Sequence, residues 1–388
     1  MKISLKRTPE QIELVKAMAS KNRDVAYEAQ VALAAFLGPV LAEVINNAPV
    51  LSNLFSPLSF NAEDNPSIPL DLYYDITDED YITIYSQQVA GGLPTNQVLP
   101  TTSEMKITTY RLDSALSFDK RYAAKSRMDV VSKTFTRMAQ EILAKQERTS
   151  GNLILSSLAA ATTNGKKHVQ RGNATGRFLL QDMNELLTLS RRVFTSFTGG
   201  TMPTGQAGMG VTDLMISPEV EEELRAMAYN PINTKAVPGN NSTNATTSIT
   251  DSGITAPESV RAGLFNGGGV SSFYGVNLMV FNEFGLTRKF NTIFDTVADT
   301  TAYTKADGTG SNAFDGTKDE LILGINRNRE SLIRAIAVDS ETGSEFSLVA
   351  DDQYSIRQNK IGYFGSLEEG RMVLDNRALF GKILRWTA

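Results

Sequence analysis

The sequence contains no cysteine, one histidine and one tryptophan among its 388 residues. Without cysteine the chain has no disulfide, no thiolate metal ligand, no iron–sulfur cluster and no cysteine nucleophile. The single histidine, His168, excludes every site that needs two histidines from one chain. A Ser-His-Asp triad would have to use His168 itself. These absences exclude several classes of catalytic and metal-binding site before any motif is considered.

An excess of positive charge is also missing, because 38 basic residues face 43 acidic ones and the net charge is −5. A domain that grips nucleic acid is normally basic. One small basic cluster, formed by Lys166, Lys167, His168 and Arg171, stands without interleaved aromatic residues. The favoured interpretation is a solvated loop with His168 at the surface. A phosphate contact, or His168 as a catalytic base, is the alternative.

No apolar run is long enough to suggest a membrane span. The most apolar stretch, residues 25–50, is interrupted by Glu28, Gly38-Pro39 and Glu43. A bilayer span needs about 20 nearly uninterrupted apolar residues. The N-terminal residues lead into a charged amphipathic stretch and do not resemble a secretory signal. We expect a soluble intracellular protein with no membrane partner.

The first helix is predicted to begin at Thr8, with Pro9 in the first turn and Gln11 completing a capping box. Apolar residues then recur at helical spacing until Gly38-Pro39, which we expect to interrupt the pattern. Two interpretations stay open: a helix packed on its own domain, or an arm that packs across neighbouring subunits. Four prolines between residues 46 and 71 indicate an extended or irregular connector.

A long β-hairpin is predicted next. Residues 72–89 are rich in β-branched and aromatic side chains, including Tyr85, and residues 105–112 form a second strand-like run. Between them Gly91-Gly92-Leu93-Pro94 is a turn signal. An isolated two-stranded ribbon is marginally stable, so this hairpin is expected to lie on its own core or on another subunit.

The strongest helical pattern covers residues 125–161, where apolar residues recur every three or four positions. A second helix is predicted over 179–197, and the glycine-rich segment 198–210 indicates a domain boundary. Residues 212–218 are predicted to form a strand that enters a helix capped by Ser217. Further strands are expected at residues 273–281 and 321–338. The tail from 353 to 384 is expected to form four short strands separated by turns.

No catalytic or cofactor motif emerges. The chain has no nucleophile elbow, and the segment ending Gly316-Thr317-Lys318 lacks the Lys-Ser/Thr pair of a phosphate-binding loop. The acidic residues of 75–80 and 299–319 match no calcium-binding loop. We therefore expect no catalytic residue, no cofactor and no metal site, and a protein that is not an enzyme.

The order of elements resembles the major capsid proteins of tailed double-stranded-DNA bacteriophages, which have the α+β Hong Kong 97-type fold. Residues 213–220, residues 273–280 and the closing segment 363–380 are similar to segments of that family. The resemblance implies five parts: an N-terminal arm (1–71), an extended hairpin loop (72–120), a peripheral domain with the spine helix (121–210), an axial domain (211–350) and a C-terminal return to the peripheral domain (351–388).

The resemblance also implies a function. The chain would self-assemble into hexamers and pentamers of an icosahedral virion shell, built in the host cytoplasm, that encloses double-stranded DNA without reading its sequence. Expected partners are other copies of the chain, a separate scaffolding protein, a portal and a decoration or cement protein. Contacts between subunits are expected in the hairpin, at Gly91, Gly92, Leu93, Pro94, Tyr85, Lys106 and Arg111. An encapsulin-like compartment shell and an oligomeric enzyme of unknown chemistry are the alternatives.

Overall fold

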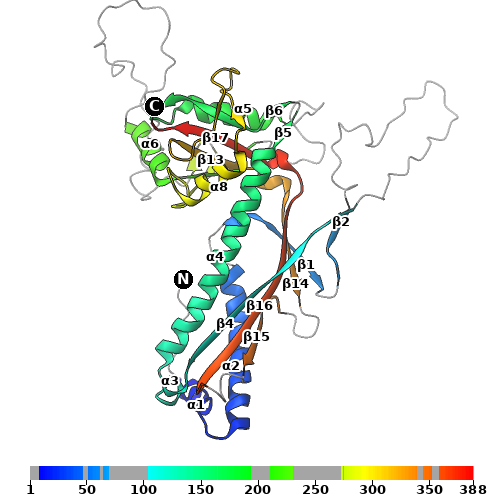
Figure 1. Ribbon diagram of the computed structural model, residues 1–388, viewed down its shortest axis with the longest axis vertical. Helices are drawn as coiled ribbons and strands as arrows, with labels where there is room; N and C mark the ends of the chain where they lie inside the picture. Colours follow the sequence, from blue (N-terminus) through cyan, green and yellow to red (C-terminus); the bar gives the residue numbers. More distant parts are fainter. Residues whose placement is uncertain are drawn as a thin grey trace, which may run out of the picture. The chain divides into compact units, whose positions relative to one another are not determined.

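The computed structural model describes residues 8–46, 51–61, 64–69, 104–163, 165–193, 210–229, 272–273, 275–338, 344–351 and 358–387. The chain forms two compact units, each made of segments distant in the sequence. Unit 1 comprises residues 1–151 and 332–372, and unit 2 comprises residues 152–331 and 373–388. Figure 1 labels the elements that follow.

Unit 1 combines helices with a five-stranded sheet. Its helices are α1 (Pro9–Ala17), α2 (Arg23–Asn46), α3 (Lys120–Ala124) and most of α4 (Met128–Ala160), with a short 3₁₀ turn at Leu51–Leu54. The sheet order is β1 (Ser56–Asn61), β14 (Leu332–Val338), β16 (Lys360–Val373) and β15 (Ser347–Asp351), and β4 (Thr109–Asp119) also pairs with β16. A separate pair joins β2 (Ser67–Pro69) to β3 (Glu104–Lys106).

Helix α1 confirms the predicted start, because the Thr8 side chain accepts a hydrogen bond from the Gln11 backbone N–H and Pro9 opens the helix. Helix α2 corrects the expected interruption, since it continues through Pro39. Proline has no backbone N–H, so the helix loses a single backbone hydrogen bond at this position. Burial of Leu33, Leu37 and Leu41 in the core of unit 1 holds the helix together across it. The described part of the N-terminal region thus packs on its own unit.

By length and composition alone, α2 is apolar enough to cross a membrane. The same test is passed by core helices of soluble proteins. Its Leu33, Leu37, Leu41 and Ile45 side chains are at most 3% exposed and belong to the core cluster of unit 1. This packing accounts for the apolar composition of one face of the helix.

Helix α4 confirms the long helix predicted for residues 125–161. Its apolar residues face the strand β16, where Phe135 lies edge-on to Tyr363 with ring centroids 5.2 Å apart. Figure 1 shows α4 running alongside β4 and β16. Gly151 lies inside the helix and does not end it. Regular 3–4 spacing of buried residues carries the helix past a single glycine.

The tail differs from the prediction, because residues 360–373 form one continuous strand instead of short strands separated by turns. Close packing requires the glycine at position 365. A β-carbon built on Gly365 would stand 2.5 Å from Phe346 Cζ and 2.6 Å from Met138 Cε. Gly365 therefore lets α4 and Phe346 approach the strand, and its presence does not signal a turn.

Unit 2 contains a six-stranded sheet in the order β7 (Val169–Thr175), β17 (Leu379–Arg385), β13 (Asp319–Ile325), β8 (Asp213–Ile216), β10 (Val276–Val280) and β9 (Ser272–Phe273). Its described helices include α5 (Leu180–Arg192), α6 (Pro218–Tyr229) and α8 (Lys289–Ala298). Two short ribbons are formed by β5 (Thr162–Thr163) with β6 (Lys166–Lys167), and by β11 (Ala302–Tyr303) with β12 (Asn312–Ala313). Short 3₁₀ turns follow β13 at Arg327–Arg329 and precede β17 at Asn376–Ala378.

The predicted passage from a strand into a helix at residues 212–218 is confirmed. Strand β8 ends at Ile216, and the Ser217 hydroxyl accepts a hydrogen bond from the Val220 backbone N–H, 3.1 Å away, at the start of α6. Helix α8 was not predicted. Its signal is the spacing of Phe290, Phe294 and Ala298, which are all buried.

Both units are assembled from segments that lie far apart in the sequence. Strand β17 pairs with β13 from Asp319↔Arg385 to Ile325↔Leu379, so the end of the chain joins unit 2. Strand β14 pairs with β1, so residues 332–351 join unit 1. Pairing between strands this far apart in the sequence leaves no local pattern by which to place a boundary.

Candidate subunit-contact surface

The residues predicted to contact neighbouring subunits divide into two groups. Tyr85 and Gly91-Gly92-Leu93-Pro94 lie outside the described residues. Lys106 is exposed on β3, where it pairs with Ser67 of β2. Arg111 lies on β4 in a different sheet, and its side chain is 58% exposed. The structure does not bring Lys106 and Arg111 onto one strand, because residues 107–108 separate β3 from β4.

Arg111 belongs to an open face of the unit 1 sheet, which we call the outer face. Cross-strand register places Val349, Phe364 and Ala115 in one row across β15, β16 and β4. Ser347, Ser366 and Asp113 form the next row, and Glu368 stands opposite Arg111. Val349 is 52% exposed. This face therefore presents an apolar row, a polar row that includes Asp113, and then the opposite charges of Arg111 and Glu368.

The alternation along each strand explains why the outer face is open. The neighbouring residues Leu348, Tyr363 and Leu367 point to the opposite side, where they pack in or against the core with α4. Side chains alternate between the two faces of a strand. The core determines which side chains lie on the inner face, and this also determines which lie on the outer face. A shift of one residue in the strand register would exchange the inward-facing and outward-facing side chains.

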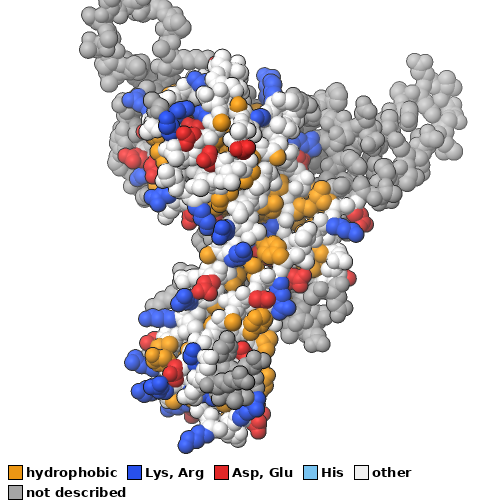
Figure 2. All heavy atoms as spheres, viewed as in Figure 1, with side chains coloured by type: hydrophobic (Ala, Val, Ile, Leu, Met, Phe, Trp, Pro, Cys, Tyr) orange, Lys and Arg blue, Asp and Glu red, His pale blue; other side chains and the backbone are white. Residues whose placement is uncertain are grey.

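Polar contacts hold the outer face in shape. The Arg111 Nε donates to Asp113 Oδ1 at 2.8 Å, and its guanidinium lies 5.9 Å from the centre of the Phe364 ring. Both partners of the ion pair are about half exposed, so the pair adds little stability. Apolar side chains lie open at the surface in this part of unit 1 (Figure 2). The arrangement suits a contact that combines apolar burial with oriented charge.

Strand β4 is also an edge strand. Among the described strands it pairs only with β16, over the register from Asp119↔Lys360 to Thr109↔Gly370. The other edge of an 11-residue strand presents backbone N–H and C=O groups that a further strand can bind. The outer face and this edge together make the candidate contact surface.

A buried ionic network lies on the inner side of the same strands. Glu369 of β16 accepts from Arg334 Nε at 2.9 Å, from Arg371 at 3.1 Å, from the Gln146 side chain at 3.0 Å and from the Tyr110 hydroxyl at 2.7 Å. Glu369 is fully buried. The network joins β4, β14 and β16 to α4 and fixes how these elements meet under the contact surface.

Burial alone would raise the pKa of the Glu369 carboxyl. The charges of Arg371 and Arg334, with the hydrogen bonds from Arg371 and Tyr110, outweigh that effect and hold its pKa below the ordinary value. Burial and the neighbouring Glu369 raise the pKa of Tyr110, so its hydroxyl remains a donor. The network is a fixed charge arrangement with every acidic and basic member paired.

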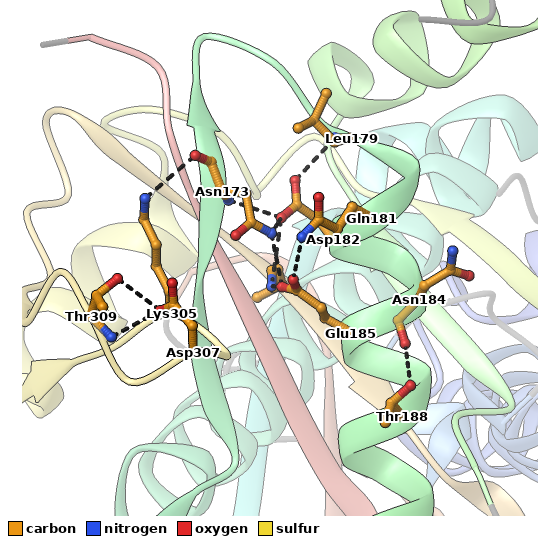
Figure 3. A network of polar contacts seen from close by, with 11 residues as sticks. Asn173, Leu179, Gln181, Asp182, Asn184, Glu185, Thr188, Lys305, Asp307 and Thr309 are labelled. Atoms are coloured by element: carbon orange, nitrogen blue, oxygen red, sulfur yellow. Dashed lines mark hydrogen bonds and ion pairs between the residues drawn. The ribbon is translucent and has the colours of Figure 1, made fainter. Parts of the chain in front are cut away.

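A second buried polar network lies in unit 2. Lys382 of β17 is fully buried, with its Nζ 2.6 Å from Glu185 Oε2 and 3.5 Å from Asp182 Oδ1. Figure 3 shows Asp182 and Glu185 pointing from α5 toward Asn173 of β7. The Asn173 side chain donates to both carboxylates at 2.9 Å, and Asp182 also accepts from the Leu179 backbone N–H. These contacts attach α5 to the sheet.

Two members of the basic cluster, His168 and Arg171, are buried and do not lie in a solvated loop as the sequence suggested, whereas Lys166 is exposed. His168 is fully buried, with Nδ1 3.1 Å from the carbonyl oxygens of Asn376 and Leu379 and Nε2 2.8 Å from Thr163 Oγ1. Arg171 is buried and pairs with Asp319 at 2.7 Å. Burial lowers the pKa of His168 and favours the neutral ring. The sequence showed polar neighbours but not the strand β17 that covers them.

Among the carboxyl groups of the described residues, Glu320 is the one whose pKa is raised to near neutral pH. It is fully buried and accepts a hydrogen bond from the Trp386 indole N–H. Burial raises its pKa to about 7. The pKa of Glu320 in the folded protein is above the ordinary value of 4.5, so the protonated carboxyl favours the folded state. This contribution to stability is complete below about pH 4.5. The contribution is lost as the pH rises through about 7.

Glu320→Gln should therefore remove a pH dependence and make unit 2 more stable than wild type by about 1–3 kcal/mol at pH 8. The measurement is urea unfolding at pH 5 and pH 8, followed by the fluorescence of Trp386, the single tryptophan. Glu222→Gln, at an exposed position of α6, is the matched control. Identical pH profiles for wild type and Glu320→Gln would contradict this account.

Among the described residues, no group of three or more His, Asp and Glu side chains is placed to hold a metal ion. A groove of about 370 Å³ in unit 1 is lined by apolar side chains together with Glu10 and Gln11. It contains no pairing of an acid with a nucleophile. What the described residues do present is the candidate contact surface, together with the two networks of buried charged side chains.

The residues that sequence reasoning missed are Val349 and Phe364. Their signal is the alternation of residues 361–367, in which Ile361, Tyr363 and Leu367 are buried and the residues between include Phe364. The glycines of this segment concealed the pattern, because they suggested turns. Arg111 lies on the opposite face of β4 from Tyr110 and Leu112, which pack in or against the core of unit 1.

The arrangement of helices and sheets is the Hong Kong 97-type capsid fold. The capsid structure of the cyanophage P-SCSP1u is similar to this chain with a TM-score of 0.50 and 12% identity, over 88% of this chain and 89% of that chain. The holo-SrpI encapsulin complex from Synechococcus elongatus PCC 7942 has a TM-score of 0.44 and 14% identity, over 87% and 89% of the two chains. No protein-family model and no curated protein matches the chain.

Proposed function

We propose that this protein is the major capsid protein of a tailed double-stranded-DNA bacteriophage and works by assembling into a shell. The observation that carries the proposal is the fold shared with the cyanophage capsid over 88% of the chain. The outer face supports it, because an apolar row with an open strand edge is a surface that other copies can cover. The chain is a structural protein and not an enzyme in this proposal.

The finer parts of the proposal concern assembly. Copies form hexamers and pentamers of an icosahedral virion shell that encloses double-stranded DNA, and they assemble in the host cytoplasm. A separate scaffolding protein, a portal and a decoration or cement protein are the proposed partners. Many modest contacts repeated in a closed shell give stability without any exceptionally tight pair.

The two units take the roles of the family's domains. We assign unit 1, with α4 as spine helix, to the peripheral domain, and unit 2 to the axial domain at the centre of a capsomer. Subunit contacts involve Arg111 with the outer face, Lys106, and the segment that contains Tyr85 and Gly91-Gly92-Leu93-Pro94. This assignment changes the boundaries expected from the sequence while keeping the same domain types.

The test is Val349→Asp, which places a carboxylate in the apolar row of the outer face. Burying an unpaired charge at every copy of a contact is costly, so shells should be lost while the subunit stays folded. Light scattering and electron microscopy of the purified protein measure assembly, and circular dichroism measures folding. Val297→Asp is the matched control, since Val297 is also exposed, at 39%, but lies on α8 of unit 2.

Shells of normal size and yield from Val349→Asp would show that the outer face is not a subunit contact. A wild-type protein that stays a monodisperse monomer at high concentration would count against the shell function itself. The two outcomes are separate, because the first concerns the surface and the second the whole proposal.

A further inference from the structure

Positive charge is concentrated in one short part of unit 1. Residues 120–148, which include α3 and most of the unit 1 part of α4, contain eight basic and three acidic residues. This segment is therefore net positive by five in a chain whose net charge is −5. Figure 2 shows Lys and Arg side chains recurring over the region where Figure 1 draws α3 and the first half of α4.

The basic residues of α4 share one exposed face. Lys133, Arg137, Lys145 and Arg148 fall within about 120° of the helix circumference at 100° per residue, and all four are exposed. They extend over about 22 Å of the helix axis at 1.5 Å per residue. The opposite face of the same helix is buried through Phe135, Met138 and Ile142. We call the four residues the α4 basic face.

Within the part of the chain that the structure describes, most of the charge of the α4 basic face has no acidic partner. Arg137 Nε pairs with Glu141 at 3.1 Å. Lys133, Lys145 and Arg148 have no carboxylate of the described residues within ion-pair distance. Glu141 is the only acidic residue inside the arc of the basic face. A face that leaves three cations unpaired on a rigid, packed helix favours a polyanionic ligand.

We propose that the α4 basic face binds the phosphate backbone of double-stranded DNA without reading its sequence. B-DNA carries about one negative charge per 1.7 Å of helix axis, so a 22 Å row of four cations meets several phosphates at once. This inference deepens the proposed container function, because it names the part of the subunit that faces the packaged genome. An acidic surface of another copy is the competing ligand, and the experiment decides between the two.

The expected binding is weak and sensitive to salt. Three to four phosphate contacts give a slope of about −2.7 to −3.6 for log affinity against log salt concentration. Raising the salt from 50 to 200 mM should then weaken binding about 40- to 150-fold. A contact of this strength holds DNA near the face without fixing it in place, since ions at moderate concentration displace it.

The experiment measures fluorescence anisotropy of a labelled 30-base-pair duplex with purified, unassembled protein separated from shells by size exclusion. The variant carries Lys133→Gln, Lys145→Gln and Arg148→Gln. We expect at least a tenfold loss of affinity at 50 mM salt and a slope reduced to about −1. The matched control removes three exposed charges from unit 2 through Arg191→Gln, Arg192→Gln and Lys289→Gln, and should stay within twofold of wild type.

Three results would overturn the inference. Wild-type protein that does not bind the duplex at 50 mM salt would do so, as would a triple variant that binds as tightly as the control. A triple variant that keeps its DNA affinity but no longer forms shells would assign the face to a subunit contact instead. Circular dichroism verifies that both variants are folded. Because shell formation is scored separately, failure of this inference is distinguishable from failure of the shell proposal.

Discussion

Glu369→Gln is expected to destabilise unit 1 by about 3–5 kcal/mol, the usual effect of breaking a buried ion pair by removing one partner. The side chains of Arg334 and Arg371 are only 6% and 1% exposed, and both lose their shared carboxylate. Glutamine keeps the size of the side chain, so no cavity contributes to the effect. The loss measures the burial of two guanidinium groups without the carboxylate that they share.

The neighbouring residue supplies the control. Glu368 stands on the opposite face of β16, across from Arg111 and partly exposed. Glu368→Gln should change the free energy of unfolding by less than about 1 kcal/mol. Urea unfolding monitored by far-ultraviolet circular dichroism compares the two variants. Equal effects of the two substitutions would show that the network does not stabilise unit 1.

The same network gives a pH dependence of known sign. The pKa of Glu369 lies below its ordinary value of 4.5 in the folded protein. Its contribution is therefore complete above about pH 4.5 and is lost as the pH falls through the folded-state pKa. Glu320 acts in the opposite direction, since its contribution is lost as the pH rises toward and through about 7.

Lys382→Met is the second large effect, with an expected destabilisation of unit 2 of about 3 kcal/mol. Asp182 is fully buried and Glu185 is 18% exposed, and both lose the cation that lies between them. Methionine fills a similar volume, so the substitution isolates the charge. The remaining hydrogen bonds from Asn173 and Leu179 limit the loss, because they still solvate the carboxylates.

Trp386 fluorescence follows this transition, since the single tryptophan packs against the core cluster of unit 2. Lys289→Met, at the exposed start of α8, is the control and should leave the unfolding midpoint nearly unchanged. Burial raises the pKa of the Glu185 carboxyl, and hydrogen bonding and charge from Lys382 bring it below its ordinary value. A Lys382→Met protein with wild-type stability would contradict the proposed role of the buried amine.

Local features of the fold were predictable from the sequence because their causes are local. The Thr8 cap, the long helix α4 and the passage from β8 into α6 each follow from spacing within a few residues. Burial of His168, Arg171 and Lys382 did not follow, since each is covered by a strand or loop far away in the sequence. Charged residues are usually exposed, and the carboxylates that pair with Arg171 and Lys382 reverse that expectation.

The contact surface was predictable only in part for the same reason. Arg111 was expected as a contact residue of the hairpin, whereas Val349 and Phe364 join it through pairing across about 235 to 255 positions of sequence. Continuity of β16 through Gly365 required knowledge of Phe346 and Met138, which approach the missing side chain. The pairing of strands whose partners are far away in the sequence can be read only from the folded structure.

The open edge of β4 bears on how the protein behaves before it assembles. Eleven residues without a proline present backbone groups that accept any extended chain, correct partner or not. If the proposed contact surface is correct, ordered assembly and irregular aggregation would compete for the same edge in a newly made subunit. Both processes accelerate with concentration, so the fraction of useful product is decided by their relative rates. Under the proposed shell function, slow assembly would cost yield even when the final particle is stable.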